Sequence, residues 1–305
     1  MPVIMPGSGS AKLSEKISEI LKIGMVEKTV RRFPDGETYI RIEDAGFSGD
    51  VVLIVQSLYP RQNERLLELF FTIDCVRENG GRPWLIIPYF AYARQDRAFQ
   101  ESEAFSLKTI GKILKSLGAE RLITVDAHFR RTPGEFDFFG IPAFNVSAVD
   151  ALVVYAGKKT KDGLVVAGPD EGSKGFLKGM DDAVFLKKTK TCPVCKRSAL
   201  ECRCKRKAKE YVIKMEVPED LENRNVLLLD DIISTGGTII AAAKALRQKK
   251  NRVFVGCTHG LFLNGSLEKI RELAEDVFCT DTIETDVSRV SVADAISSGL
   301  RRLLR

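Results

Sequence analysis

The chain lacks the features expected of a membrane-spanning or secreted protein. No uncharged apolar run approaches the roughly 20 residues that a helix needs to cross a bilayer. Residues 1–9 do not show the charged, long apolar pattern of a secretory signal. Cysteine is sparse outside one segment, because Cys75, Cys257 and Cys279 are scattered singly, unlike the cysteines of a secreted disulfide framework. We therefore expect a cytoplasmic protein with no membrane contact.

The composition is that of a globular protein of more than one domain. The chain has 305 residues, of which 44% are apolar and 29% charged, enough to bury a large core. Its net charge is +6, but residues 186–209 alone hold ten Lys or Arg against the single acid Glu201. Elsewhere the two signs alternate as on an ordinary surface. The excess charge therefore does not by itself indicate nucleic-acid binding, and a polyanionic substrate also needs a basic site.

Short apolar runs alternate with segments in which apolar residues recur every three or four positions. The runs that predict buried strands are 51–55, 83–88, 121–125, 164–167, 226–229 and 253–257. The segments that predict helices include 64–77, 106–117 and 238–247. Such alternation is typical of parallel sheets covered on both faces, so we expect an α/β protein of two doubly wound domains. We place these at residues 1–145 and 146–305, with the crossing within 144–161.

The segment Val226–Thr238 carries the strongest functional signal. Its apolar run leads into Asp230 and Asp231, and a turn of hydroxyls and glycines then precedes the Ala-rich helical segment 239–246. The turn residues are Ser234, Thr235, Gly236, Gly237 and Thr238. Their hydroxyl and backbone N–H groups, at the positive end of the next helix, suit a phosphate. The two acids suit sugar hydroxyls or a magnesium ion, so the segment predicts a site for a phosphorylated sugar.

This turn resembles the ribose-phosphate loop of type I phosphoribosyltransferases and of ribose-phosphate pyrophosphokinases. Further segments resemble the second family, in its order and over nearly the whole chain. They are Arg32-Phe-Pro-Asp-Gly-Glu37, Ile87-Pro-Tyr-Phe-Ala-Tyr-Ala-Arg-Gln-Asp96, Thr124-Val-Asp-Ala-His128, Gly168-Pro-Asp-Glu-Gly172 and Thr258-His-Gly260. A phosphoribosyltransferase is not expected to carry the Tyr-Ala-Arg-Gln-Asp segment. The resemblance implies two domains that each have the type I phosphoribosyltransferase fold.

The resemblance also implies an ATP site in the N-terminal half. Arg94 and Gln95 match family positions that contact ATP, and their place after an apolar strand agrees with ligand binding at the carboxyl end of a sheet. Phe33, Asp35 and Glu37 match a loop that completes the adenine site of a neighbouring subunit. The family loop would make the enzyme at least a dimer. Taken alone, Phe33-Pro-Asp-Gly predicts only a tight turn.

The matching family positions assign magnesium and catalysis to other residues. His128 and Asp170 match the ligands of the ion that binds ATP, although imidazole is an unusual ligand for magnesium. Lys188 and Lys190 match a Lys-x-Arg pattern in a catalytic loop. Lysine at 190 keeps the charge of that arginine but loses its planar fork. Ser234 also stands where many family members carry an acid, and this difference is compatible with phosphate binding.

A cluster of four cysteines interrupts this loop and has no counterpart in the family pattern. Cys192, Cys195, Cys202 and Cys204 fall within thirteen positions and can surround a tetrahedral zinc ion. An iron–sulfur site, internal disulfides or a redox pair are the alternatives, because Cys-x-Cys is tighter than the usual second knuckle. The insertion spans about residues 188–209. Its run of basic residues could bind nucleic acid, but few aromatic residues lie among them, so nucleic acid is not the expected partner.

The resemblance implies that ATP and ribose 5-phosphate react to 5-phosphoribosyl 1-pyrophosphate and AMP, by attack of the C1 hydroxyl on the β-phosphorus. Lys188, Lys190 and Mg²⁺ would stabilise the transferred group. Two alternatives stay open at this point: a catalytically silent homologue that binds nucleotide and a partner enzyme, and a phosphoribosyltransferase.

Overall fold

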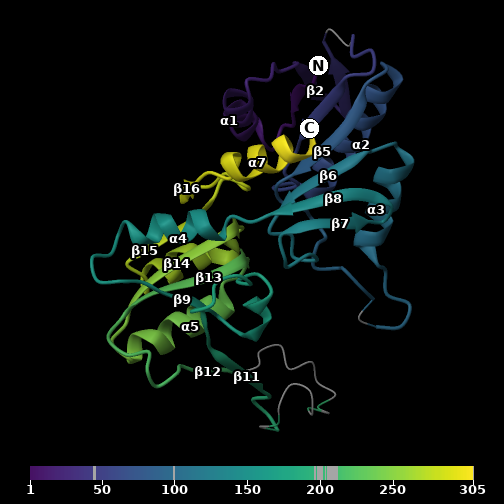
Figure 1. Ribbon diagram of the computed structural model, residues 1–305. Helices are drawn as coiled ribbons and strands as arrows, with labels where there is room; N and C mark the ends of the chain where they lie inside the picture. The colour runs from purple at the N-terminus through teal and green to yellow at the C-terminus, as the bar shows by residue number, and fades with distance from the viewer. Residues whose placement is uncertain are drawn as a thin grey trace. The chain divides into compact units, whose positions relative to one another are not determined.

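The computed structural model describes residues 1–43, 46–98, 100–195, 197, 202, 204 and 212–304. Contacts divide the chain into two compact units (Figure 1). The first unit is Met1–Ala148 together with Thr280–Arg305, and the second unit is Val149–Cys279. In the predicted division, everything after residue 145 belongs to one domain. The C-terminal segment groups with the first unit because its helix α7 (Ala293–Leu303) contacts α1 (Ala11–Leu21) and strands β6 (Arg121–Val125) and β8 (Ile141–Val146).

The first unit is built on a six-stranded sheet of order β1-β4-β5-β6-β8-β7. Its strands are β1 (Val3–Pro6), β4 (Val51–Val55), β5 (Arg82–Ile87), β6 (Arg121–Val125), β7 (Gly134–Phe138) and β8 (Ile141–Val146). All neighbours pair in parallel except β7, which runs antiparallel to β8. Figure 1 shows α1 and α7 on one side of this sheet, and α2 (Gln62–Glu78) and α3 (Ser106–Ser116) on the other.

The second unit contains a parallel sheet with the order β10-β9-β13-β14-β15. Its strands are β9 (Val165–Gly168), β10 (Val184–Phe185), β13 (Asn225–Ile233), β14 (Arg252–Gly260) and β15 (Asp276–Thr280). Helix α4 (Val149–Gly157) covers one face and α5 (Gly237–Gln248) the other (Figure 1). Shorter elements are η1 (Glu171–Lys174), η2 (Leu263–Gly265) and α6 (Ser266–Arg271), and β16 (Ser288–Val290) follows in the C-terminal segment.

The predicted α/β class with parallel sheets is confirmed, and each predicted strand and helix is present with bounds shifted by a few residues. The strand predicted at 253–257 continues to Gly260 as β14, and the strand predicted at 226–229 is also longer than expected. The prediction ended it before the two acids, whereas β13 continues through Asp230 and Asp231 to Ile233. It does so because β14 pairs beside it from Arg252 to Gly260 and satisfies its backbone groups. No helix in the described residues is long and apolar enough to span a membrane.

Two antiparallel hairpins stand apart from the sheets. In the first unit, β2 (Lys28–Arg32) pairs with β3 (Thr38–Ile42) around the predicted Phe33-Pro-Asp-Gly turn. In the second unit, β11 (Lys187–Thr191) pairs with β12 (Val212–Glu216). The periodicity of buried strands does not detect either hairpin, because most of their residues are exposed or half-buried.

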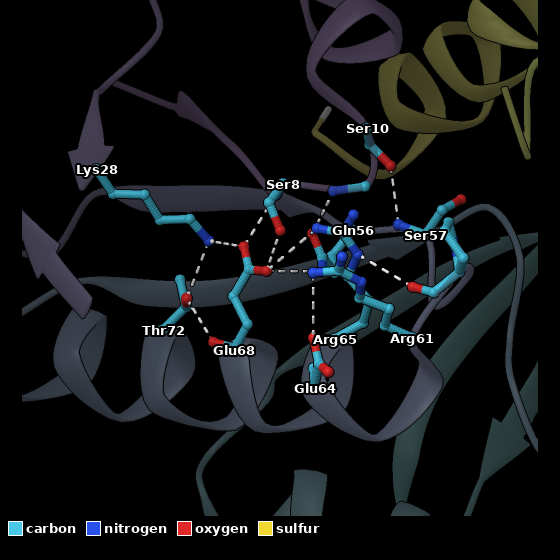
Figure 2. A network of polar contacts seen from close by, with 12 residues as sticks. Ser8, Ser10, Lys28, Gln56, Ser57, Arg61, Glu64, Arg65, Glu68 and Thr72 are labelled. Atoms are coloured by element: carbon cyan, nitrogen blue, oxygen red, sulfur yellow. Dashed lines mark hydrogen bonds and ion pairs between the residues drawn. The ribbon is translucent and has the colours of Figure 1, made fainter. Parts of the chain in front are cut away.

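A buried ion pair links the first hairpin to helix α2 (Figure 2). Lys28 Nζ lies 3.0 Å from Glu68 Oε1, and the two side chains are only 2% and 4% exposed. Glu68 also accepts hydrogen bonds from the backbone N–H and the hydroxyl of Ser8, and from Gln56 Nε2. Arg65 lies 3.5 Å from the same carboxylate. The charge of Glu68 is therefore balanced and hydrogen-bonded inside the unit, as a buried carboxylate requires.

Candidate active site

The turn after β13 places the predicted sugar-phosphate residues at the start of helix α5. Gly236 is the residue before the helix and has a left-handed φ of 70°. A Cβ at this position would meet the Ser266 Cβ at 2.9 Å, so both the backbone and the space require glycine. The carbonyl of Ser234 accepts from the Ser266 hydroxyl at 3.1 Å and from the Leu263 N–H at 2.9 Å. Hydrogen bonds from η2 and α6 therefore stabilise the turn.

Asp230 and Asp231 lie near the carboxyl end of β13, which continues through Ile233 to this turn. Each carboxylate accepts a hydrogen bond from the backbone N–H of the next residue. Asp231 N donates to Asp230 Oδ1 at 3.1 Å, and Ile232 N donates to Asp231 Oδ1 at 2.8 Å. Burial, and next the charge of Asp231, raises the pKa of Asp230 well above its usual range, and the charge of Asp170 acts in the same direction. Three carboxylates therefore crowd one end of the second sheet, a setting that favours a bound cation.

Lys188 brings three separately predicted segments together. Its ammonium donates to Asp170 Oδ2 at 2.8 Å and to the Thr238 hydroxyl at 2.8 Å. Asp170 follows β9 and accepts the Gly172 N–H at 2.8 Å, so its carboxylate is fixed at the start of η1. Lys190 is two positions further along β11, on the same face of the strand, and is exposed. The predicted catalytic lysine, metal ligand and phosphate turn are therefore neighbours within the second unit.

Two of the predicted ATP residues, Arg94 and Gln95, and the predicted metal ligand His128 lie at one edge of the first sheet. Arg94 and Gln95 follow β5, and His128 follows β6, its parallel neighbour. Carboxyl ends of adjacent parallel strands meet at the same edge, where open α/β sheets bind ligands. Arg94 and Gln95 are exposed, and the Ser106 hydroxyl donates to Gln95 Oε1. His128 belongs to the first unit and Asp170 to the second, and their sharing of one ion stays a prediction.

Phe33, Asp35 and Glu37 form the tip of the β2–β3 hairpin. The Phe33 N–H donates to the Glu37 carbonyl at 2.9 Å, and Glu37 N donates to Asp35 Oδ1 at 3.1 Å. The Phe33 ring is 43% exposed and meets Tyr39 edge-on, with centroids 5.7 Å apart. An exposed aromatic ring beside two acids is suited to a purine with an exocyclic amine. Its use by a neighbouring subunit stays a prediction.

The four clustered cysteines converge on one point. Their sulfurs all lie within 4.8 Å of one another, and Cys192 is fully buried. Cys192 Sγ is 3.9 Å from Cys204 Sγ, and Cys195 Sγ is 3.6 Å from Cys202 Sγ. The backbone N–H groups of Cys195 and Val194 lower the pKa of Cys192 to about 6, while the neighbouring thiols raise that of Cys204 to about 12. The cluster can hold a metal ion. The remainder of the predicted insertion, 196, 198–201, 203 and 205–209, lies outside the described residues.

The Lys28–Glu68 pair was not predicted from the sequence. Its signal is present, because Glu68 falls on the buried face of α2 together with Leu69, Thr72 and Ile73. A carboxylate among apolar positions of a helix indicates a buried partner of opposite charge. The partner lies forty residues earlier, on a hairpin that the periodicity did not reveal.

Comparisons with known proteins agree with this arrangement. Residues 2–118 match the model for the N-terminal domain of ribose phosphate pyrophosphokinase, and residues 156–295 match that for the phosphoribosyl transferase domain. The ribose-phosphate pyrophosphokinase of Methanopyrus kandleri is 34% identical and covers 99% of both chains. That of Pyrococcus furiosus is 35% identical over 96% of this chain and 99% of its own. The phosphoribosylpyrophosphate synthetase structure from Mycobacterium smegmatis has the same fold, with a TM-score of 0.81, 24% identity, and coverage of 99% and 98% of the two chains.

Proposed function

The chain belongs to the ribose-phosphate pyrophosphokinase family, and we propose that it converts ATP and ribose 5-phosphate to 5-phosphoribosyl 1-pyrophosphate and AMP. The C1 hydroxyl oxygen of the sugar forms a bond to the β-phosphorus. The bond from that phosphorus to the α,β-bridging oxygen breaks, AMP leaves with the electron pair, and the hydroxyl proton goes to solvent. No covalent enzyme intermediate is needed, because alignment and charge stabilisation suffice for such a transfer.

The single observation that carries this proposal is the position of Lys188. Its ammonium is 2.8 Å from Thr238 in the phosphate turn and 2.8 Å from Asp170. From this position Lys188 can donate to the oxygens of the group being transferred, and Lys190 adds a second positive charge on the same face of β11. In this proposal residues 234–238 hold the 5-phosphate, Asp230 and Asp231 receive the ribose hydroxyls or their metal, and Arg94 with Gln95 positions ATP.

Magnesium fits the carboxylates at the end of the second sheet. Asp170, Asp230 and Asp231 offer hard oxygen ligands, which Mg²⁺ prefers, and a bound cation would offset the burial and the charges of Asp231 and Asp170 that raise the pKa of Asp230. When bound, the ion would neutralise charge on the phosphate oxygens. Asp170 is the ligand assigned here, with His128 as the assignment from the family pattern. ATP, ribose 5-phosphate and a further copy of this chain are the proposed partners. The cytoplasmic location stays a prediction.

Zinc is the metal we assign to the cysteine cluster. A tetrahedral ion with Zn–S bonds of about 2.3 Å places its sulfurs about 3.8 Å apart. The separations of 3.9 Å and 3.6 Å lie on either side of that value. Four sulfur ligands within 4.8 Å of one another bind as thiolates only when a cation balances their charge.

Phosphorus NMR of the protein with Mg-ATP and ribose 5-phosphate tests the reaction directly. We expect AMP and a sugar-linked pyrophosphate to appear together, in equal amounts. ATP binding without either product would overturn the proposal and favour the silent homologue. Consumption of 5-phosphoribosyl 1-pyrophosphate with an added base, without ATP binding, would indicate a phosphoribosyltransferase instead.

A further inference from the structure

The hairpin that carries Lys188 and Lys190 has little apolar support of its own. None of the residues of β11 or β12 is buried, and the two strands form a separate two-stranded sheet. Such a hairpin is marginally stable in water when no hydrophobic face packs against it. Helix α5 contacts β12, whereas the side chain of Lys188 reaches Asp170 and Thr238 from β11. The position of β11 therefore depends on its pairing with β12.

The connection between the two strands makes that pairing costly. Thr191 pairs with Val212, so the 20 residues 192–211 must close the hairpin. Hairpin connections are usually about 2–5 residues, and the entropic cost of closure rises with length. Cys192 is the first residue after β11, is fully buried, and donates its N–H to the Arg197 carbonyl at 2.8 Å. The four-sulfur cluster therefore begins at the point where the strand pairing ends.

We propose that a metal ion at Cys192, Cys195, Cys202 and Cys204 maintains the pairing of β11 with β12 and thereby positions Lys188 for catalysis. This inference rests on the proposed function only for its kinetic consequence. An ion bound by both Cys192 and Cys204 would close residues 192–204 into a loop, and these residues are most of the connection 192–211. Loss of this metal should therefore lower kcat, because Lys188 is no longer held in place. The ribose 5-phosphate turn at 234–238 should form with or without the metal. The cysteines act as positioning residues, because they touch neither substrate nor reacting atom.

The test compares the purified protein before and after removal of the cluster metal, with Mg²⁺ restored in excess. Elemental analysis should find about one zinc per chain, and cobalt substitution should give the absorption of a tetrahedral thiolate site. Hydrogen exchange of the β11 and β12 amides should accelerate by about tenfold or more without the metal, since their hydrogen bonds open more often. We expect kcat to fall by about tenfold and ribose 5-phosphate affinity to change less than about twofold. Added zinc should restore exchange and kcat together.

A paired Cys202→Ser/Cys204→Ser variant should behave as the metal-free protein does. Cys75→Ser is its control, because Cys75 lies on α2 outside the cluster. Unchanged exchange and kcat after metal loss, or a protein that contains and takes up no metal, would overturn the inference. A protein that forms no product at all, but whose β11 and β12 amides still lose protection with the metal, would refute the proposed function and support the metal tether.

Discussion

The ammonium of Lys188 and the carboxylate of Asp170 form an ion pair of 2.8 Å between β11 and the loop after β9. The two side chains are 14% and 28% exposed, so water screens their attraction less than it would at the surface. The same ammonium donates to Thr238, so the side chain of Lys188 bridges Asp170 and the first turn of α5. A cation that binds Asp170 would compete with Lys188 for that carboxylate and leave the lysine to the phosphate oxygens.

Replacing Lys188 by alanine should lower kcat by about 10²–10³, because a charge aimed at the transferring group is lost. Ribose 5-phosphate affinity should change little, since the turn at 234–238 has its own supports at Leu263 and Ser266. Steady-state kinetics and direct binding of the sugar measure the two effects. Lys187→Ala is the matched control, because Lys187 is 74% exposed and pairs only loosely with Glu216 at 3.6 Å. An unchanged kcat would remove Lys188 from the catalytic assignment.

Asp170→Asn should raise the Mg²⁺ concentration needed for half-maximal activity by about tenfold, because a neutral amide replaces a charged ligand. The measurement is a magnesium titration at fixed ATP and sugar. Glu171→Gln serves as control, since that neighbouring acid is 75% exposed and pairs with Lys174. If both variants showed the same magnesium dependence as the unaltered protein, Asp170 would not be a ligand.

Much of the fold and of the second unit's site was predictable from the sequence. Buried parallel strands such as Val51–Val55 are continuous apolar runs, and their bounds follow from that pattern. The turn between β13 and α5 was predictable because glycines and hydroxyls separate an apolar run from a helical pattern, and its binding of phosphate stays a prediction. The meeting of Lys188 with Asp170 and Thr238 was not predicted as a contact, although each residue was assigned to the site.

The remainder depended on long-range contacts that leave weak local signals. The hairpins β2–β3 and β11–β12 are mostly exposed, so neither shows the apolar pattern of a core strand. Helix α7 joins the first unit because its apolar face packs on α1, and this partner is more than 270 residues away in sequence. Strand β13 extends beyond its apolar run because its backbone hydrogen bonds to β14 do not depend on side-chain type.

Gly236→Ala should destabilise the second unit by about 1–3 kcal/mol and weaken ribose 5-phosphate binding. Its φ of 70° is unfavourable for alanine, and the new Cβ would lie 2.9 Å from the Ser266 Cβ. Gly237→Ala is the control for stability, because a Cβ there meets nothing within 4 Å. Thermal unfolding of both variants distinguishes the two positions. Equal melting temperatures would show that the left-handed conformation of Gly236 is not required.

Glu68→Gln should lower the free energy of unfolding by about 3–5 kcal/mol, because it leaves the Lys28 ammonium buried without its anionic partner. Glu64→Gln is a control from one turn earlier on the same helix. The Glu64 side chain is 41% exposed where it pairs with Arg32 and, at 3.7 Å, with Arg61, so the loss of these exposed pairs should cost no more than about 1 kcal/mol. Adding Lys28→Met to Glu68→Gln should recover part of the loss. Urea unfolding of the unaltered protein, of Lys28→Met, of Glu68→Gln and of the double variant measures this coupling, and additive effects would contradict it.

The stability supplied by Glu68 should also depend on pH. Burial alone would raise the pKa of Glu68, but the charge of Lys28 and the donors of Ser8 lower it below its ordinary value of 4.5. A carboxyl whose pKa is lower in the folded state contributes stability that is complete above the unfolded value and is lost as the pH falls through the folded value. The difference in unfolding free energy between the unaltered protein and Glu68→Gln should therefore be constant from pH 7 to about 5 and shrink below 4.5. Urea unfolding across this range measures it. A difference that persists undiminished at pH 3 would mean that packing around residue 68, and not its charge, is the source of the stability.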